Sequence, residues 1–174
     1  MKSILRTILL GITCAAAGLS SSCITSSNSD AMKAVAVSAS RGTGQPVSVS
    51  VAGGSETTPI GGPGITDEGF KDALEGSLVQ SGLFSKTGGG GYTLTAYIAG
   101  IEQPVVGFSM RVNLEVSYTL SRGGSVVWKK NIRTPYVAPV GEAFAGWVRL
   151  RKATEGAARE NISALIRSLD EAKI

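Results

Sequence analysis

The chain has 174 residues, a formal net charge of +4, no histidine and two cysteines. Hydrophobic residues make up 43% and charged residues 17%, which excludes a disordered acidic chain and is enough for one globular core. The lack of histidine excludes Ser-His-Asp and Cys-His catalysis and His-ligated zinc, and the small net charge argues against a nucleic-acid partner.

Residues 1–22 have the composition of a bacterial secretory signal peptide. Lys2 and Arg6 precede an apolar run from Thr7 to Leu19, and three serines follow it. The run is shorter than the roughly 20 residues that span a bilayer, and no later segment is as long and apolar, so we expect no transmembrane helix. Removal of the signal also removes both cations, which leaves 15 positive against 13 negative side chains and a net charge of +2.

The segment Leu19-Ser20-Ser21-Ser22-Cys23 resembles a lipobox, in which the cysteine is acylated and becomes the new N-terminus. The small residues fit this pattern, although the leucine lies four residues before the cysteine and not the usual three. Cys14 fits less well because it lies inside the apolar run. The alternative is ordinary cleavage near Ala15-Ala16-Ala17, with Cys23 left as a free thiol. In either case the mature chain retains one cysteine at most and forms no internal disulfide.

After Cys23 we expect a polar flexible tether over residues 23–31 and one domain over residues 32–174. Met32–Ser40 is a possible first strand. The valines at 47, 49 and 51 alternate with serines, which is typical of a half-buried strand. Gly53–Gly64 contains five glycines and two prolines and is predicted to be a loop.

A helix is predicted after this loop. Thr66 is the expected N-cap, with Asp67 and Glu68 in the first turn. Gly82 is the expected C′ residue, after which Leu83-Phe84 folds back on the last turn. The loop and helix do not fit a phosphate-binding motif, because the Gly-Lys-Ser/Thr ending is absent and the two acidic residues would repel an anion.

Three alternating segments follow, beginning at Tyr92, Met110 and Val126. Each has one apolar and one polar face, which predicts strands of an antiparallel meander. Arg122-Gly123-Gly124-Ser125 predicts a hairpin turn, because adjacent glycines supply the positive φ angles of a primed turn.

The last 30 residues predict an amphipathic helix. Arg151 lies within its apolar stripe, where it would extend its charged group to water, pair with Glu155 one turn later, or bind a buried carboxylate such as Glu115. The apolar side comprises Trp147, Thr154, Ala158, Ile162, Leu165 and Leu169. Together the elements predict an α+β fold: an antiparallel sheet of about four or five strands with two helices packed on one face.

The densest group of cations is a possible contact for anionic lipid headgroups or an acidic partner; the alternative is an ordinary solvated surface. Lys129 and Arg133 should share the polar face of the sheet, with Lys130 on the opposite face. An apolar linker between two strands would contact a partner or lipid, or else fold under the sheet. The residues concerned are Lys129, Arg133, Arg149, Arg151 and Lys152, and in the linker Val105, Val106 and Phe108.

Chemistry without histidine would depend on carboxylates. A hydrolytic pair would have to come from Glu102, Glu115 and Glu142, but their spacing places no two of them across a cleft. The acidic residues at the start of the first long helix are interpreted as dipole partners and a solvated face instead of a metal site. We therefore expect no catalytic residue, no metal and no cofactor.

The order of these elements resembles that of small Gram-negative envelope lipoproteins. The segment from Phe70 to Phe84, with its Ser81-Gly82-Leu83-Phe84 ending, resembles an element of the auxiliary lipoproteins of ABC transporters. The segment from Arg149 to Ile162 resembles the final helix of YajG-type lipoproteins, and the whole likeness covers about Val47 to Leu169. A lipopolysaccharide-assembly lipoprotein that plugs an outer-membrane barrel has a related layout. The resemblance implies a non-enzymatic accessory protein and supplies no catalytic residues.

The leading hypothesis is therefore an envelope lipoprotein, anchored through Cys23, that binds a partner or takes part in lipid or envelope transport. The alternative is a structural homo-oligomer in which exposed strand edges pair. A hydrolase that uses serine or carboxylates is a third hypothesis. The residue after Cys23 is Ile24 and not the aspartate that retains some lipoproteins at the inner membrane. The resemblance therefore favours the outer membrane, with the domain facing the periplasm.

Overall fold

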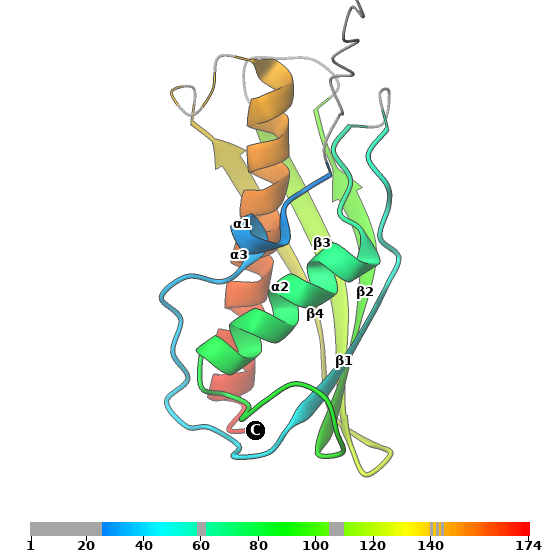
Figure 1. The fold of residues 1–174 in the computed structure, drawn as a ribbon, viewed down its shortest axis with the longest axis vertical. Helices are drawn as coiled ribbons and strands as arrows, with labels where there is room; N and C mark the ends of the chain where they lie inside the picture. Colours follow the sequence, from blue (N-terminus) through cyan, green and yellow to red (C-terminus); the bar gives the residue numbers. More distant parts are fainter. Residues whose placement is uncertain (1–25, 59–61, 105–109, 140, 142, 144) are drawn as a thin grey trace, which may run out of the picture.

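The computed structural model describes residues 26–58, 62–104, 110–139, 141, 143 and 145–174. One open four-stranded sheet carries the helices on one face (Figure 1). Across the sheet the order is β1 (Val47–Ala52), β2 (Tyr92–Glu102), β3 (Met110–Arg122) and β4 (Ser125–Ala138). The helices are α1 (Ser29–Met32), α2 (Asp67–Gln80) and α3 (Gly146–Glu171). The predicted α+β class, with two long helices on one face of the sheet, is confirmed.

The direction of β1 differs from the prediction. β1 pairs with β2 in parallel, whereas the β2–β3 and β3–β4 pairs are antiparallel as expected. The reason is the connection: α2 lies between β1 and β2 and crosses over the sheet, and a crossover of this kind returns the chain to the end at which the first strand began. The sheet is therefore mixed.

Residues 32–40 form no strand, which corrects the prediction for this segment. The Ala34 N–H donates to Ser77 Oγ (2.9 Å), and the Ala39 N–H donates to the Ser81 carbonyl (2.9 Å). Because these backbone groups bond to the second half of α2 and its C-cap, they are not used in a sheet ladder. The side chains of Met32 and Ala34 are buried by the same packing.

Residues 27–31 also belong to the folded domain, so the tether is shorter than expected. The Ser27 N–H donates to the Gly64 carbonyl (3.3 Å), and the Asn28 N–H donates to Glu155 Oε1 (2.9 Å). Arg159 Nη1 donates to the Ala31 carbonyl (3.0 Å). Residues 23–25 of the predicted tether lie outside the described residues.

The predicted boundaries of α2 are confirmed. Thr66 Oγ1 accepts the Gly69 N–H (3.1 Å), which satisfies one of the free donors of the first turn. Gly82 has a φ of +77°, which glycine adopts without strain. Leu83 and Phe84 then fold back and are buried, with the Phe84 N–H donating to the Leu78 carbonyl (3.4 Å).

The meander is confirmed, with one irregularity. Gly123 and Gly124 have φ angles of +56° and +81°, as a primed hairpin turn requires. In β2 the register shifts between Ile98 and Gly100, so one extra residue reverses the alternation of faces. As a result Ile101 faces the core, and Glu102 lies on the open face of the sheet.

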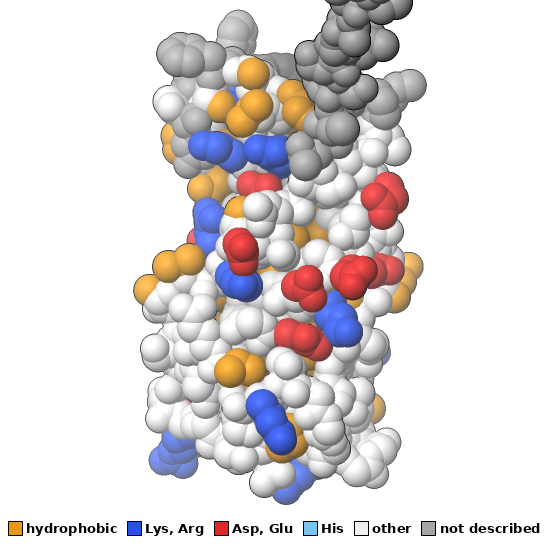
Figure 2. All heavy atoms as spheres, viewed as in Figure 1, with side chains coloured by type: hydrophobic (Ala, Val, Ile, Leu, Met, Phe, Trp, Pro, Cys, Tyr) orange, Lys and Arg blue, Asp and Glu red, His pale blue; other side chains and the backbone are white. Residues whose placement is uncertain are grey.

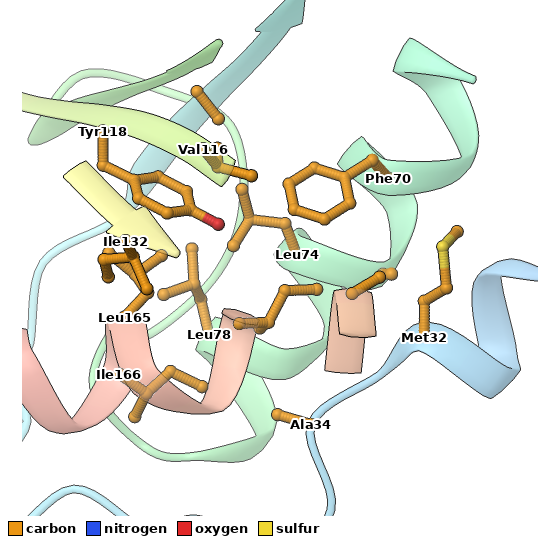
Figure 3. Close-up of a cluster of buried hydrophobic side chains, with 14 of the residues drawn as sticks. Met32, Ala34, Phe70, Leu74, Leu78, Val116, Tyr118, Ile132, Leu165 and Ile166 are labelled. Atoms are coloured by element: carbon orange, nitrogen blue, oxygen red, sulfur yellow. The ribbon is translucent and has the colours of Figure 1, made fainter. Parts of the chain in front are cut away.

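The core lies between the sheet and the two long helices, and Figure 3 shows part of it. Phe70, Leu74 and Leu78 of α2 meet Leu165 and Ile166 of α3 there, over side chains from β3 and β4. The predicted apolar side of α3 is buried except for Trp147, which is half-buried. Among the described residues, no helix is both long enough and apolar enough to cross a membrane.

Candidate functional site

The two ends of the sheet differ in what they carry. β2 and β4 finish at one end, where β3 and α3 begin; we call it the loop end (Figure 1). The opposite end carries the turn at Gly123-Gly124 and the C-terminus, and we call it the hairpin end. At the loop end, Gln103 Nε2 donates to the Pro63 carbonyl (2.8 Å) and to Thr154 Oγ1 (3.0 Å). This side chain therefore joins β2, the β1–α2 loop and α3.

Two of the predicted contact residues lie on the open face of the sheet. Lys129 is opposite Thr119, and Arg133 is opposite Glu115. Arg133 also forms an ion pair with Glu102 (2.6 Å between Nη2 and Oε2). As predicted, Lys130 faces the other way, and its Nζ donates to Ser168 Oγ of α3 (2.9 Å).

The other three predicted cations, Arg149, Arg151 and Lys152, lie in the first two turns of α3 at the loop end. Because α3 packs on the covered face of the sheet, these cations belong to a different layer from Lys129 and Arg133. The structure therefore does not bring the five predicted cations together in one surface. It divides them into a pair on the open face and a group at the loop end.

Arg151 pairs with Glu155, one of the three partners considered from the sequence. The distance from Arg151 Nε to Glu155 Oε1 is 3.8 Å, and the two side chains are 32% and 9% exposed. Glu115 lies on the open face of the sheet, so it is not the partner of Arg151. Glu155 has a second role that the sequence did not indicate, because it also accepts the Asn28 N–H from 127 residues away.

The apolar linker residues Val105, Val106 and Phe108 lie outside the described residues, as do Cys23 and Glu142. The structure therefore places no side chain at those predicted positions. The described part of the loop end does contain partly exposed apolar side chains. These are Trp147, Val148 and Leu150, all in the first turns of α3.

Two of the carboxylates considered for chemistry have structural partners. Glu102 Oε2 accepts hydrogen bonds from Arg133 (2.6 Å) and Asn113 (3.0 Å) on the open face. Asp67 Oδ1 accepts the Gly54 N–H (2.6 Å), so it occupies an amide that an anion bound by the glycine-rich loop would need. In the ranges that the structure describes, no group of three or more cysteine, aspartate or glutamate side chains is arranged to hold a metal ion.

Asp170, at the hairpin end, holds the segment before β1 and should make stability depend on pH. The Ser40 hydroxyl donates to Asp170 Oδ2 (2.7 Å) and lowers the pKa of this carboxyl below its ordinary value of 3.8. Desolvation of the carboxyl raises the pKa and so opposes this shift. The N–H groups of Ser40 and Arg41 and the charge of Arg41 lower the pKa further. Because the folded-state pKa is the lower one, the contact stabilises the fold above pH 3.8, and the effect is lost as the pH falls through the folded-state pKa.

Asp170→Asn should therefore lower the urea midpoint of unfolding at pH 7, and the difference from the parent protein should shrink towards pH 2. Asp72→Asn, on the exposed side of α2, removes one carboxylate without the Ser40 contact and serves as the control. A difference that stays constant over this pH range would show that Asp170 does not contribute through its charge.

Comparisons with known proteins support the fold but identify no family. A scan against protein-family models finds no match, and a search of curated proteins finds no significant one. Protein XCC0632 from Xanthomonas campestris, described as family DUF330, has a TM-score of 0.54 and 12% identity over 74% of this chain and 86% of that chain. The hypothetical protein CT253 from Chlamydia trachomatis has a TM-score of 0.55 and 8% identity over 74% and 96% of the two chains.

A minor lipoprotein from Acinetobacter baumannii has a TM-score of 0.48 and 8% identity over 76% of this chain and 96% of that chain. At identities this low, the likeness to XCC0632 and CT253 shows a shared fold and nothing more. The resemblance to YajG-type lipoproteins is not confirmed.

Proposed function

We propose that this chain is a lipid-anchored protein of the bacterial envelope, whose α+β domain binds a partner and catalyses no reaction. The observation that carries the proposal is the signal-like segment that ends in Ser20-Ser21-Ser22-Cys23, only four residues before Ser27, which among the described residues is the first one bonded to the domain. An acyl group on Cys23 would therefore hold the domain directly at a membrane surface.

The use of the polar side chains supports a role in binding. Near the loop end, three acidic side chains accept hydrogen bonds that hold other parts of the domain in place. They are Glu102, Asp67 and Glu155. The open face of the sheet presents alternating polar side chains with Tyr97, which is 54% exposed. This exposed, mainly polar surface suits contact with another macromolecule better than the enclosure of a small substrate.

The experiment is the intact mass of the protein extracted from membranes of a Gram-negative host that expresses the full chain. The native protein should begin at Cys23 and carry the mass of its acyl chains, and Cys23→Ala should abolish that mass. Cys14→Ala is the matched control: residue 14 leaves with the signal peptide, so this variant should yield the same mature mass as the native chain.

An unacylated native chain cut near Ala17 would contradict the proposal and make the protein a secreted domain with a free thiol. If the acyl mass is found, separation of inner and outer membranes tests the proposed outer-membrane location. Crosslinking in intact cells then tests whether the domain faces the periplasm and which envelope component it contacts.

The second candidate function is a structural homo-oligomer, in which copies would pair through the edge strand β4. Val126 and Val127 are 62% and 45% exposed near the start of β4 and favour such a contact. Lys129, Lys130 and Pro135 on the same strand disfavour it, because charge and proline typically protect a strand edge from pairing. The molecular mass of the acylated protein in detergent decides between a discrete oligomer and a monomer.

A further inference from the structure

The length of the free tether limits which part of the domain can reach the membrane. Asn28 is bonded to Glu155, which lies nine residues after the start of α3 at Gly146, or about 14 Å along the helix axis. Cys23 precedes Asn28 by five residues, which span at most about 17 Å when extended. Cys23 can therefore lie level with the start of α3, at the loop end.

The hairpin end is beyond this reach. Glu171, at the end of α3, lies sixteen residues after Glu155, or about 24 Å along the helix in the opposite direction. An acylated Cys23 can therefore bring either the loop end or the flank around α1 against the membrane.

The charge of the loop end distinguishes these two orientations. Arg149, Arg151 and Lys152 lie in the first two turns of α3, whose first turn contains no acidic residue, and Arg151 pairs with Glu155. Three acidic side chains of the neighbouring β1–α2 loop and of the first turn of α2 line a hollow of about 410 Å³. Its acidic lining residues are Glu56, Asp67 and Glu68.

Apolar side chains accompany these cations. Trp147, Val148 and Leu150 are half-buried in the same turns of α3. Figure 2 shows hydrophobic side chains gathered at this end of the molecule, with a pair of basic side chains directly below them. Partly exposed apolar groups beside cations are typical of surfaces that lie in the interface of an anionic bilayer.

We propose that the loop end rests on the membrane that holds Cys23, with Trp147 at headgroup level and Arg149 and Lys152 beside the phosphates of anionic lipids. The proposal depends on the acyl anchor of the proposed function. In this orientation the strands of the sheet point end-on towards the bilayer, and the hairpin end is the part farthest from it.

The chain contains two tryptophans, one near each end, and they test the orientation. Trp128 lies ten residues before the end of β4, which places it about 33 Å from the loop end. Trp128→Phe leaves Trp147 as the reporter, and Trp147→Phe leaves Trp128. Each acylated variant, checked for native circular dichroism, is reconstituted into vesicles of phosphatidylethanolamine and phosphatidylglycerol with brominated acyl chains, which quench tryptophan fluorescence on contact.

We expect the bromine-induced loss of fluorescence to be at least about twofold greater for Trp147 than for Trp128. Arg149→Gln combined with Lys152→Gln should reduce it, because each cation contributes roughly a fivefold factor to binding at an anionic surface. Lys129→Gln combined with Arg167→Gln removes two exposed cations away from the loop end and should leave the quenching of Trp147 unchanged. Vesicles without phosphatidylglycerol should resemble the first double variant.

Flotation of the vesicles separates failure of this inference from failure of the anchor. Protein that floats with the vesicles while Trp147 is not quenched more than Trp128 overturns the orientation and leaves the anchor intact. Equal quenching of both tryptophans, as expected for a domain lying on its flank, also overturns it. Protein that does not float at all contradicts the anchor, and the orientation with it.

Discussion

Replacement of Asn161 by leucine should lower the free energy of unfolding by about 2–4 kcal/mol, because it leaves several buried polar groups without a partner. The Asn161 amide donates to the Ile132 carbonyl (2.9 Å) and to Thr134 Oγ1 (3.1 Å), and its oxygen accepts the Tyr118 hydroxyl (2.8 Å). Both Asn161 and Tyr118 are fully buried, and burial raises the pKa of the Tyr118 hydroxyl well above its ordinary value, so it remains a donor. The measurement is urea unfolding followed by circular dichroism.

Tyr118→Phe in the Asn161→Leu background is the control. It removes the hydroxyl that the leucine leaves unpaired, so the double variant should recover about 1 kcal/mol relative to Asn161→Leu alone. An Asn161→Leu protein as stable as the parent would show that the network does not hold α3 against β3 and β4. The expected loss is a large share of the free energy of unfolding, which is typically roughly 5–15 kcal/mol for a domain of this size.

The parts of the fold that the sequence predicted correctly depend on neighbours within a few residues. Thr66 bonds to Gly69, three residues away, and the φ angles of Gly123 and Gly124 define their own hairpin. The alternation of apolar and polar residues in β3 likewise needs no information from elsewhere in the chain. Local chemistry of this kind is readable from one sequence.

The prediction of a strand before β1 is wrong because the hydrogen-bond partners of this segment lie far away in the sequence. Asn28, Ala34 and Ser40 bond to groups that lie 127, 43 and 130 residues further along the chain. Met32–Ser40 was predicted to be a strand, but these backbone donors are satisfied by α2 and α3. The parallel direction of β1 was missed for a related reason, since a period of two residues indicates a buried face but not a neighbouring strand.

The candidate surfaces show the same limit. The pairing of Arg151 with Glu155 follows from helical spacing, and the opposite faces of Lys129 and Lys130 follow from strand alternation. The separation of Arg133 from Arg149 does not follow from such spacing, because it depends on which face of the sheet α3 covers. The position of Glu102 on the open face depends on the register shift after Ile98, which no residue pattern in the sequence predicted.

Gly156→Ala should destabilise the protein by about 1–3 kcal/mol, although alanine is the better helix former by up to about 1 kcal/mol. A Cβ at this position would lie on the ring of Tyr136 in β4, closer than 3.0 Å to three ring carbons. Arg159 also holds the ring in place, because its guanidinium lies 5.7 Å from the ring centroid and its Nη2 donates to the Tyr136 hydroxyl (3.4 Å). α3 can therefore approach β4 closely only with glycine at this turn, and the shift of the urea midpoint measures the effect.

Two variants separate this contact from a general effect of glycine in a helix. In α2 the Cβ of Gly76→Ala would face the end of the Lys33 side chain, which can move aside, so this variant should be neutral or slightly stabilising. In a Tyr136→Leu background the obstacle to the Gly156 Cβ is smaller, and Gly156→Ala should then lose most of its cost, which a double-mutant cycle reports as a coupling between the two positions. Additive effects of the two substitutions would mean that Gly156 is not needed for the contact between α3 and β4. Strong coupling would show that this close approach helps to position α3 against β4.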